Sequence, residues 1–370
     1  MMENHGYAEV TGNPNMPFLN AFAKKSASAS NYYAVAHPSL TNYLEVVGGS
    51  NFGVLNDHSP DWHNGACQTN LATGQPSLDT GAYANICPIA GSGTDAATPA
   101  VDLSNFECND AGPCVNVDGS VSLAAASTVG KTIAHQLVAT GRTPKAYEEN
   151  LPPTGADGVN SADGYWSNLN PPSSVGITDG VLGLYAGRHN PFAYFVDIQS
   201  GGNPHLSLNR IVDFDSPTGL FADLASGNVP SYSYIVSNQC NDQHGRSGAG
   251  PACDYDPNNT GTLTGLNPAL VFAGDPAIER IVTGIKASPA WKSGRNAIVI
   301  VWDESDYANA PITNQVTLVV QTNDGGSSGV VSNRFYTHFS LLKSIEAGFG
   351  LPCLNHACDS NVAVMTDLFN

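Results

Sequence analysis

Short runs of apolar residues alternate along the chain with longer segments in which apolar residues recur at helical spacing. The runs predict buried strands at residues 32–36, 191–198, 231–236, 296–302 and 316–321, with a further extended run at 145–148. The helical spacing predicts helices at residues 17–25, 39–48, 127–139, 268–288 and 337–348, and helical turns within 206–224. Continuous apolar strands separated by helices predict an α/β fold with a mostly parallel sheet covered on both faces.

Residues 51–124 lack this pattern and are rich in Gly, Asn, Asp and Ser. We interpret them as a loop-rich insertion, stapled by disulfides, that could serve as a lid over a site formed by the rest of the chain. With that insertion included, we expect residues 1–370 to form a single domain.

The number and setting of the cysteines favour disulfides. There are eight, an even number, and none has the CxxC spacing that favours zinc. Their loop-like flanks argue against the alternative of eight reduced core cysteines, so we expect an oxidising compartment. Proximity in sequence suggests four pairs: Cys67–Cys87, Cys108–Cys114, Cys240–Cys253 and Cys353–Cys358.

Charge and hydropathy exclude some classes of partner. The net charge of −18 argues against a nucleic-acid surface, which needs clustered Lys and Arg, and against adhesion to anionic bilayers. No apolar run approaches the roughly 18 residues of a membrane span, so we expect no stable membrane insertion. An acidic surface is compatible with binding a cation.

Ser39 stands where the strand pattern of residues 32–36 gives way to helical spacing, directly after His37-Pro38. A hydroxyl at that junction lies beside free backbone N–H groups and the positive end of a helix dipole. This setting favours phosphate binding or an activated attacking oxygen. Serine at such a junction also commonly does no more than cap the helix, and these residues alone favour that simpler role.

Polar residues follow two of the predicted strands, where the sites of parallel α/β sheets lie. Asp303, Glu304 and Asp306 come directly after residues 296–302, and they would repel one another unless a cation compensates. The simpler interpretation is a solvated acidic turn. After residues 231–236 come Asn238, Asp242 and His244, in a loop that a disulfide would hold.

Two further polar segments complete the chemistry-bearing residues. Arg188-His189-Asn190 precedes residues 191–198, and Glu3-Asn4 stands near the start. A hydroxyl, several oxygen donors and several imidazoles together point to phosphoryl or sulfuryl transfer, in which positioning and charge neutralisation do most of the catalysis.

Six segments, quoted in order, resemble the bacterial and fungal phosphoesterase family: ENHGY, NYYAVAHPSLTNYL, GRHNPF, NQCNDQHG, VIVWDESD and YTHFSLLKSIEAGFGLP. That family contains secreted acid phosphatases and phosphocholine-type phospholipases C, within the wider alkaline-phosphatase/sulfatase-like fold. The resemblance covers nearly the whole chain, and the HPSLxNYL and NQCxDxHG motifs are its most specific parts.

The resemblance implies an αβα sandwich that hydrolyses phosphate monoesters through a seryl-phosphate intermediate, with Ser39 as nucleophile. It implies one divalent metal ion, with Ca, Mg, Zn and Fe all open, and a metal-independent variant also stays open. The residues that would hold the metal are Glu3, Asn4, Asp303 and Glu304.

The resemblance also implies roles around the phosphoryl group. His189, His244 and Asp242 would contact it or protonate the leaving oxygen. Asn42, Asn238 and His338 are weaker predictions for substrate binding. The expected substrate is a small phosphoester or a phosphoinositide, and the expected location is secreted, extracellular or periplasmic.

The chain departs from the family pattern at its start. The family's Glu-Asn pair follows a core strand, whereas only Met1 and Met2 precede Glu3 here, so we expect that strand to be missing upstream. Two alternatives to an acid phosphatase remain: a phosphodiesterase of phospholipase C type, and a secreted binding module that kept the fold but lost catalysis.

Overall fold

The computed structural model describes residues 1–52, 54, 57, 60, 86, 88–90, 92–93, 128–151, 183–246, 248–254, 267–305 and 314–370. Most of the predicted insertion at 51–124 lies outside these residues, as do Asp306 and the pairs predicted for Cys67–Cys87 and Cys108–Cys114. The two other predicted disulfides, Cys240–Cys253 and Cys353–Cys358, are confirmed.

One half of the core is a parallel three-stranded sheet with the order β6-β5-β7. Its strands are β5 (Pro144–Glu148), β6 (Ile211–Asp213) and β7 (Tyr232–Val236). The register places Ala146 opposite Tyr234 and Glu148 opposite Val236, so β5 and β7 end together at one edge. The loops that follow these two strands therefore lie side by side.

The other half is a four-stranded sheet with the order β10-β1-β9-β8. Its strands are β1 (Ala27–Ala29), β8 (Ala297–Val301), β9 (Leu318–Thr322) and β10 (Val331–Ser332). β9 runs antiparallel to both β1 and β8, whereas β10 pairs with β1 in parallel. The expected α/β class is confirmed, and the reversal is confined to the pairings of β9 in this sheet.

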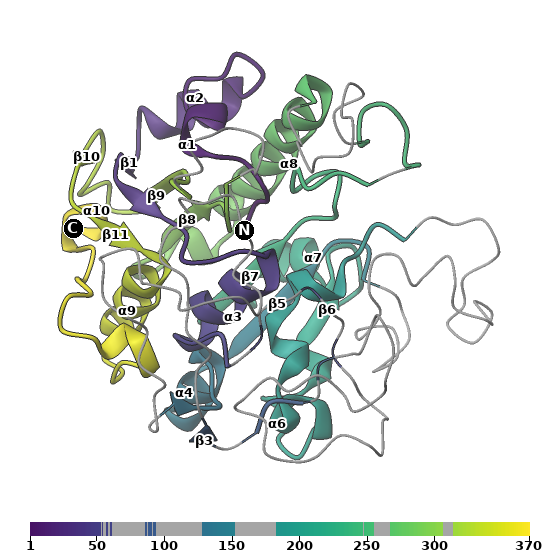
Figure 1. The fold of residues 1–370 in the computed structure, drawn as a ribbon, viewed down its shortest axis with the longest axis vertical. Coiled ribbons are helices and arrows are strands. Elements are labelled where there is room, and N and C mark those ends of the chain that lie inside the picture. The colour runs from purple at the N-terminus through teal and green to yellow at the C-terminus, as the bar shows by residue number, and fades with distance from the viewer. Residues whose placement is uncertain are drawn as a thin grey trace, which may run out of the picture.

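Residues 1–3 join the two sheets. The Met1 nitrogen donates to the Ile235 carbonyl of β7 at 2.8 Å, and the Met2 nitrogen donates to the Val301 carbonyl of β8 at 2.8 Å. Asp303 donates its amide to the Met2 carbonyl at 3.0 Å. Figure 1 shows the N-terminus between β7 and β8. Glu3 is thereby placed beside the residues that follow both strands.

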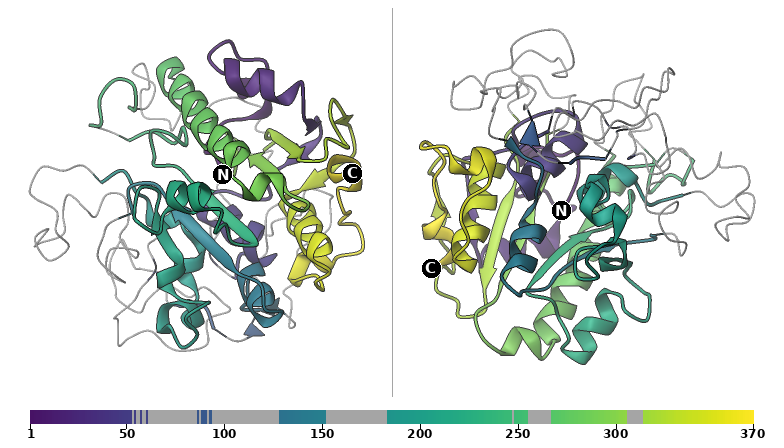
Figure 2. Two further views of the ribbon diagram at one scale, coloured as in Figure 1. Left: turned by 180° about the vertical axis from the view of Figure 1, so that it is seen from behind. Right: turned by 90° about the horizontal axis from the view of Figure 1, so that it is seen from below.

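Helices cover both faces of the core. On one face, α7 (Leu220–Ser226) and α8 (Pro268–Ala287) pack against Tyr147 and Ile235. On the other lie α3 (Ser39–Gly48), α4 (Ile133–Ala139) and α9 (His338–Phe349), and Tyr43 of α3 meets Tyr234 edge to face. The left view of Figure 2 shows α8 in front of the strands and α3 behind them.

The shorter elements complete the described chain. They are α1 (Tyr7–Val10), α2 (Pro17–Ala23), β2 (Tyr32–Tyr33), β3 (Ser92–Gly93), β4 (Thr128–Val129), η2 (Gly187–His189), η3 (Pro191–Tyr194), α6 (Val196–Ser200), η4 (Leu208–Arg210), η5 (Ala290–Lys292), β11 (Tyr336–Thr337), η6 (Asn355–Cys358) and α10 (Thr366–Phe369). Among the described helices, none is long and apolar enough to cross a membrane.

The prediction of a strand at residues 191–198 is wrong. The segment forms η3 and α6, and every residue from Pro191 to Phe195 is buried. A short continuous apolar run cannot separate a buried strand from a buried helical segment. Proline suits the first turn of a helix, as Pro191 does here, and Gly201 ends α6 with φ +65°. Likewise, residues 206–224 contain strand β6 as well as helical turns.

Candidate active site

Ser39 is the first residue of α3, and its side chain does not cap the helix. Pro38 holds the N-cap position, and the Ser39 hydroxyl lies 3.1 Å from Glu3 Oε2 and 3.2 Å from Glu304 Oε1. A serine with a capping role would instead accept a hydrogen bond from a backbone N–H of its own helix. The geometry therefore decides against the capping interpretation and leaves a buried hydroxyl whose hydrogen-bond acceptors are two carboxylates.

Three further carboxylates lie close to that of Glu3. Glu3, Asp242, Asp303 and Glu304 are all buried, and they come from the segment between the sheets, the loop after β7 and the end of β8. Asn4 adopts the left-handed conformation at φ +54° and donates its backbone amide to Asp303 Oδ1 at 3.1 Å. The hydrogen bonds of residues 1–3 to both sheets explain why Glu3 reaches residues so distant in sequence.

Burial disfavours the charged form of these carboxylates. It raises the pKa of Asp303 to about 7, and it raises the pKa of Glu3 and of Asp242 well above the ordinary values. The neighbouring carboxylates raise the pKa of Glu3 further. A bound cation would reverse this cost by neutralising the cluster.

Some of the predicted metal ligands offer buried oxygens to a cation. Within the part of the chain that the structure describes, Asn4 Oδ1 and Asp303 Oδ2 make no hydrogen bond, and Glu3 Oε1 lies 3.1 Å from His189 Nε2. Buried polar atoms in native proteins are almost always satisfied, so oxygens of this kind are candidates for binding a ligand. These atoms belong to three of the four residues predicted to hold the metal, and the fourth, Glu304, contacts Ser39.

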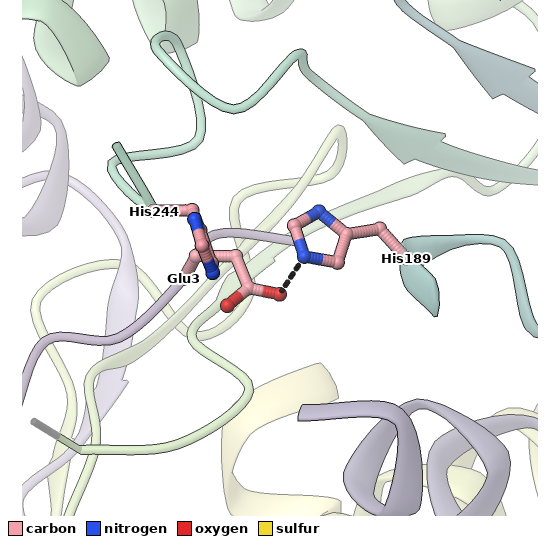
Figure 3. Close-up of side chains that lie close together, drawn as sticks. All are labelled: Glu3, His189 and His244. Atoms are coloured by element: carbon pink, nitrogen blue, oxygen red, sulfur yellow. Dashed lines mark ion pairs between the residues drawn. The ribbon is translucent and has the colours of Figure 1, made fainter. Parts of the chain in front are cut away.

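A second donor set overlaps the first at Glu3. One side-chain atom each of Glu3, His189 and His244 lie within 4.8 Å of one another (Figure 3). His189 Nε2 is 3.1 Å from Glu3 Oε1, and His189 Nδ1 is 3.0 Å from Asp242 Oδ2. A histidine held by a carboxylate through its other nitrogen is the usual arrangement at metal centres. Mixed imidazole and carboxylate ligands suit Zn or Fe, whereas oxygen ligands suit Mg or Ca.

His189 is uncharged in this setting. Burial, and then the nearby Arg188 and His244, lower its pKa well below the ordinary value. Its ring stacks on Tyr43 at 5.3 Å between centroids and 8° between planes. Tyr43 lies one helical turn after Ser39, so α3 supplies both the hydroxyl and the ring that orients His189.

His244 is held in one tautomer. Its Nδ1 lies 2.7 Å from the Gly245 carbonyl, which can only accept, so Nδ1 carries the proton. Its Nε2 therefore accepts from Arg188 Nη2, at 2.8 Å. Arg188 is buried and its Nε is 3.8 Å from Asp57 Oδ2, so a desolvated guanidinium lies at the rim of the site.

The structure places the three predicted substrate-binding residues around the site, each with side-chain partners of its own. Asn42 donates to Glu304 Oε2 at 3.1 Å and to the Ala36 carbonyl. His338 contacts Tyr32 Oη at 2.8 Å and the Asp303 carbonyl at 2.6 Å. Asn238 donates to Asn150 Oδ1 at 2.7 Å and accepts from the backbone of its own turn.

Sequence reasoning gave no role to His37, Tyr43 or Glu149. His37 Nδ1 is 3.0 Å from Glu304 Oε2, and burial lowers the pKa of His37 to about 3. The spacing of four between Ser39 and Tyr43 could have identified Tyr43, because such residues share a helix face. Glu149 could have been found by inspecting the residues directly after the extended run at 145–148.

Curated relatives of the chain are phosphatases at low sequence identity. An acid phosphatase of Aspergillus fumigatus is 22% identical over 98% of the chain, which covers 56% of that protein. A phosphatidylinositol-3-phosphatase of Mycobacterium tuberculosis is 20% identical over 99% of the chain, which covers 80% of that protein. The chain thus spans little more than half of the fungal relative.

Two solved structures that resemble the chain are each 11% identical to it in sequence. A protein of the alkaline phosphatase superfamily from Vibrio parahaemolyticus matches with a TM-score of 0.47, over 97% of this chain and 68% of its own. A phosphonate monoester hydrolase of Agrobacterium radiobacter matches with a TM-score of 0.44, over all of this chain and 76% of its own. The family assignment rests on sequence instead. The sequence model of the Phosphoesterase family matches residues 2–253, and the chain belongs to this family.

Proposed function

We propose that the chain is an acid phosphatase that hydrolyses phosphate monoesters through a seryl-phosphate intermediate. The observation that carries this proposal is the buried Ser39 hydroxyl at the start of α3, within 3.2 Å of two carboxylates. The family assignment and the phosphatase activity for which the relatives are named support phosphoester hydrolysis.

In the first step, the Ser39 oxygen attacks phosphorus, and the bond from phosphorus to the leaving oxygen breaks. The hydroxyl proton passes to Glu3 or Glu304, the two groups that already accept its hydrogen bond. The leaving oxygen takes a proton from His189 Nε2, and Asp242, 3.0 Å from His189 Nδ1, supplies a proton to the same ring. Water then attacks the seryl-phosphate, which releases phosphate and restores Ser39.

Glu3, Asn4, Asp303 and Glu304 would hold one divalent metal ion. Bound there, the metal would stabilise negative charge on the phosphoryl oxygens. Asp242 orients His189 through the contact at Nδ1, and Tyr43 holds the same ring by stacking. The predicted substrate is a small phosphomonoester, and a phosphoinositide fits the name of the mycobacterial relative.

The disulfides Cys240–Cys253 and Cys353–Cys358 support a location outside the reducing cytoplasm, so we propose that the protein is secreted. Fractionation of the native host tests this: activity found only in the cytosol would contradict it.

The decisive test compares Ser39→Ala with Ser305→Ala on p-nitrophenyl phosphate at acid pH. Ser305 is buried two residues from Asp303, and among the described residues its hydroxyl has no hydrogen-bond partner, so its removal is a matched control. We expect Ser39→Ala to lose activity and Ser305→Ala to keep it. Rapid acid quenching should leave a phosphoryl group on the Ser39 peptide of the wild type. Full turnover by Ser39→Ala would end the nucleophile assignment.

Two further arms separate the alternatives. Faster hydrolysis of p-nitrophenylphosphorylcholine than of the monoester would favour a phosphodiesterase. Activity that survives EDTA would exclude an essential exchangeable metal, and failure to bind both a divalent metal and vanadate would favour a decayed binding module.

A further inference from the structure

The loop after β5 is attached to the loop after β7 by side-chain hydrogen bonds. Glu149 Oε2 accepts from the Asn238 backbone amide at 3.0 Å and from Asn241 Nδ2 at 2.8 Å. Asn150, at φ +61°, accepts from Asn238 Nδ2 at 2.7 Å. Glu149 and Asn238 are both buried, so water competes little for these bonds.

Asn238 begins the turn at residues 238–245, and it determines the shape of that turn. Its side-chain oxygen accepts from the amides of Cys240 and Asn241, and its carbonyl accepts from the amide of Asp242 at 2.8 Å. Glu149 and Asn150 hold Asn238 from outside. Together with the Cys240–Cys253 disulfide, they fix where the turn starts.

The far end of the same turn carries residues of the site. Asp242 Oδ1 accepts from the amide of His244 at 2.7 Å, and the Asp242 carbonyl accepts from the amide of Glu3 at 2.8 Å. Asp242 Oδ2 contacts His189 Nδ1 at 3.0 Å. An unbroken series of hydrogen bonds thus leads from Glu149, through the turn, to three residues of the site.

We infer that Glu149 and Asn150 are positioning residues for the reaction. They act by fixing the turn at residues 238–245, and thereby place Asp242 against His189 and His244 against Arg188. This inference rests on the proposed function. A displacement of about 1 Å in a catalytic group can lower the rate by about 100-fold. Loosening the start of the turn should therefore lower kcat.

A competing role for Glu149 is an ion pair with α8. Arg280 Nη1 is 3.7 Å from Glu149 Oε1, but the Arg280 side chain is 50% exposed and its Nη2 binds Asp215 at 2.9 Å. An exposed pair at this distance contributes little to stability. Arg280→Ala is therefore the control that removes the ion pair and leaves the turn attached.

The test uses Glu149→Ala, Glu149→Gln and Arg280→Ala, each measured by kcat and KM. We expect Glu149→Ala to lower kcat by about 10- to 100-fold. Glu149→Gln should recover most of that loss, because both hydrogen bonds go to Oε2 and one amide oxygen can accept both. Arg280→Ala should stay near the wild type. Equal losses in Glu149→Gln and Glu149→Ala, or an effect of Arg280→Ala as large as that of Glu149→Ala, would overturn the inference.

A double-mutant cycle shows whether Glu149 acts through the turn. If it does, Glu149→Ala should reduce activity far less in a His244→Ala background than in the wild type. The same fold loss in both backgrounds would overturn the inference.

A second readout does not depend on catalysis. Hydrogen exchange at the amides of Asp242 and Gly245 should quicken in Glu149→Ala and stay unchanged in Arg280→Ala. Unchanged exchange in Glu149→Ala would overturn the attachment itself. Quickened exchange in a protein that hydrolyses no phosphoester would leave the attachment intact and place the failure in the proposed function.

Discussion

Helix α2 begins without a capping side chain of its own, and α8 supplies one. Pro17 is the first residue of α2, and the next two amides donate to one carboxylate: Phe18 to Asp275 Oδ2 and Leu19 to Asp275 Oδ1, each at 2.8 Å. Asp275 is 3% exposed and lies in α8. Its negative charge also faces the positive end of the α2 dipole.

The expected cost of losing Asp275 follows from these two bonds. A hydrogen bond to a charged group is worth about 1.5–3 kcal/mol, so Asp275→Ala should lower the free energy of unfolding by about 3–6 kcal/mol. Asp275→Asn keeps one side-chain oxygen as acceptor, but its NH2 group faces the second backbone N–H and cannot accept from it. The expected loss in the free energy of unfolding is therefore about half of that for Asp275→Ala. Glu279→Gln, exposed on the same helix, removes the same charge without these bonds and should stay within about 0.5 kcal/mol.

Urea unfolding, followed by fluorescence and by hydrogen exchange at Phe18 and Leu19, measures these costs. The midpoint should fall in the order Glu279→Gln, Asp275→Asn, Asp275→Ala. If the free energies of unfolding of Asp275→Ala and the Glu279→Gln control differ by less than about 1 kcal/mol, the Asp275 carboxylate does not stabilise α2 as argued.

Three further substitutions probe stability away from the site. Burial raises the pKa of Glu346 in α9 from 4.5 to about 8, so the folded state keeps a proton that the unfolded state loses, and stability should fall as pH rises from 4.5 to 8. Glu346→Gln should flatten that fall in the melting temperature; identical slopes in both proteins would contradict it. Gly49→Ala should lower the urea midpoint more than Gly12→Ala. Both glycines have positive φ, but only at Gly49 would a Cβ meet a carbonyl, Leu354 O at 2.5 Å, so equal losses would contradict this.

The sequence predicted those helices and strands whose own hydrophobic pattern is long or strongly apolar. Residues 296–302 and 268–288 appear as β8 and α8 almost at the predicted bounds, because each pattern is long or strongly apolar. The run at 191–198 was misjudged because its burial comes from packing on all sides, which hides the difference between a strand and a helix. The direction of β9 was also beyond reach, since pairing direction depends on contacts distant in sequence.

For the candidate site, the rule of inspecting the ends of strands named segments that the structure brings together, but it did not give the direction in which each side chain faces. Asp303, Glu304, Asp242 and His244 do converge on Ser39 or Glu3. Asn238, which follows the same strand as Asp242, turns its side chain toward Asn150 instead. Which way a polar side chain faces in a turn depends on partners from another loop, and the order of residues along the chain does not contain that information.

Because residues 1–3 lie between the two sheets, the proposed activity depends on how firmly the two halves of the core are held together. Asp303 and Glu304 follow β8, and Asp242 and His244 follow β7. Glu3 is linked to both groups, because its amide donates to the Asp242 carbonyl and the Ser39 hydroxyl contacts both Glu3 and Glu304. A slip of one half of the core against the other would pull the two oxygens of Glu3 away from Ser39 or from His189. Gentle heating or low denaturant should therefore abolish the proposed phosphatase activity while the helices are still intact, so an activity assay would detect loosening of the two halves before circular dichroism does.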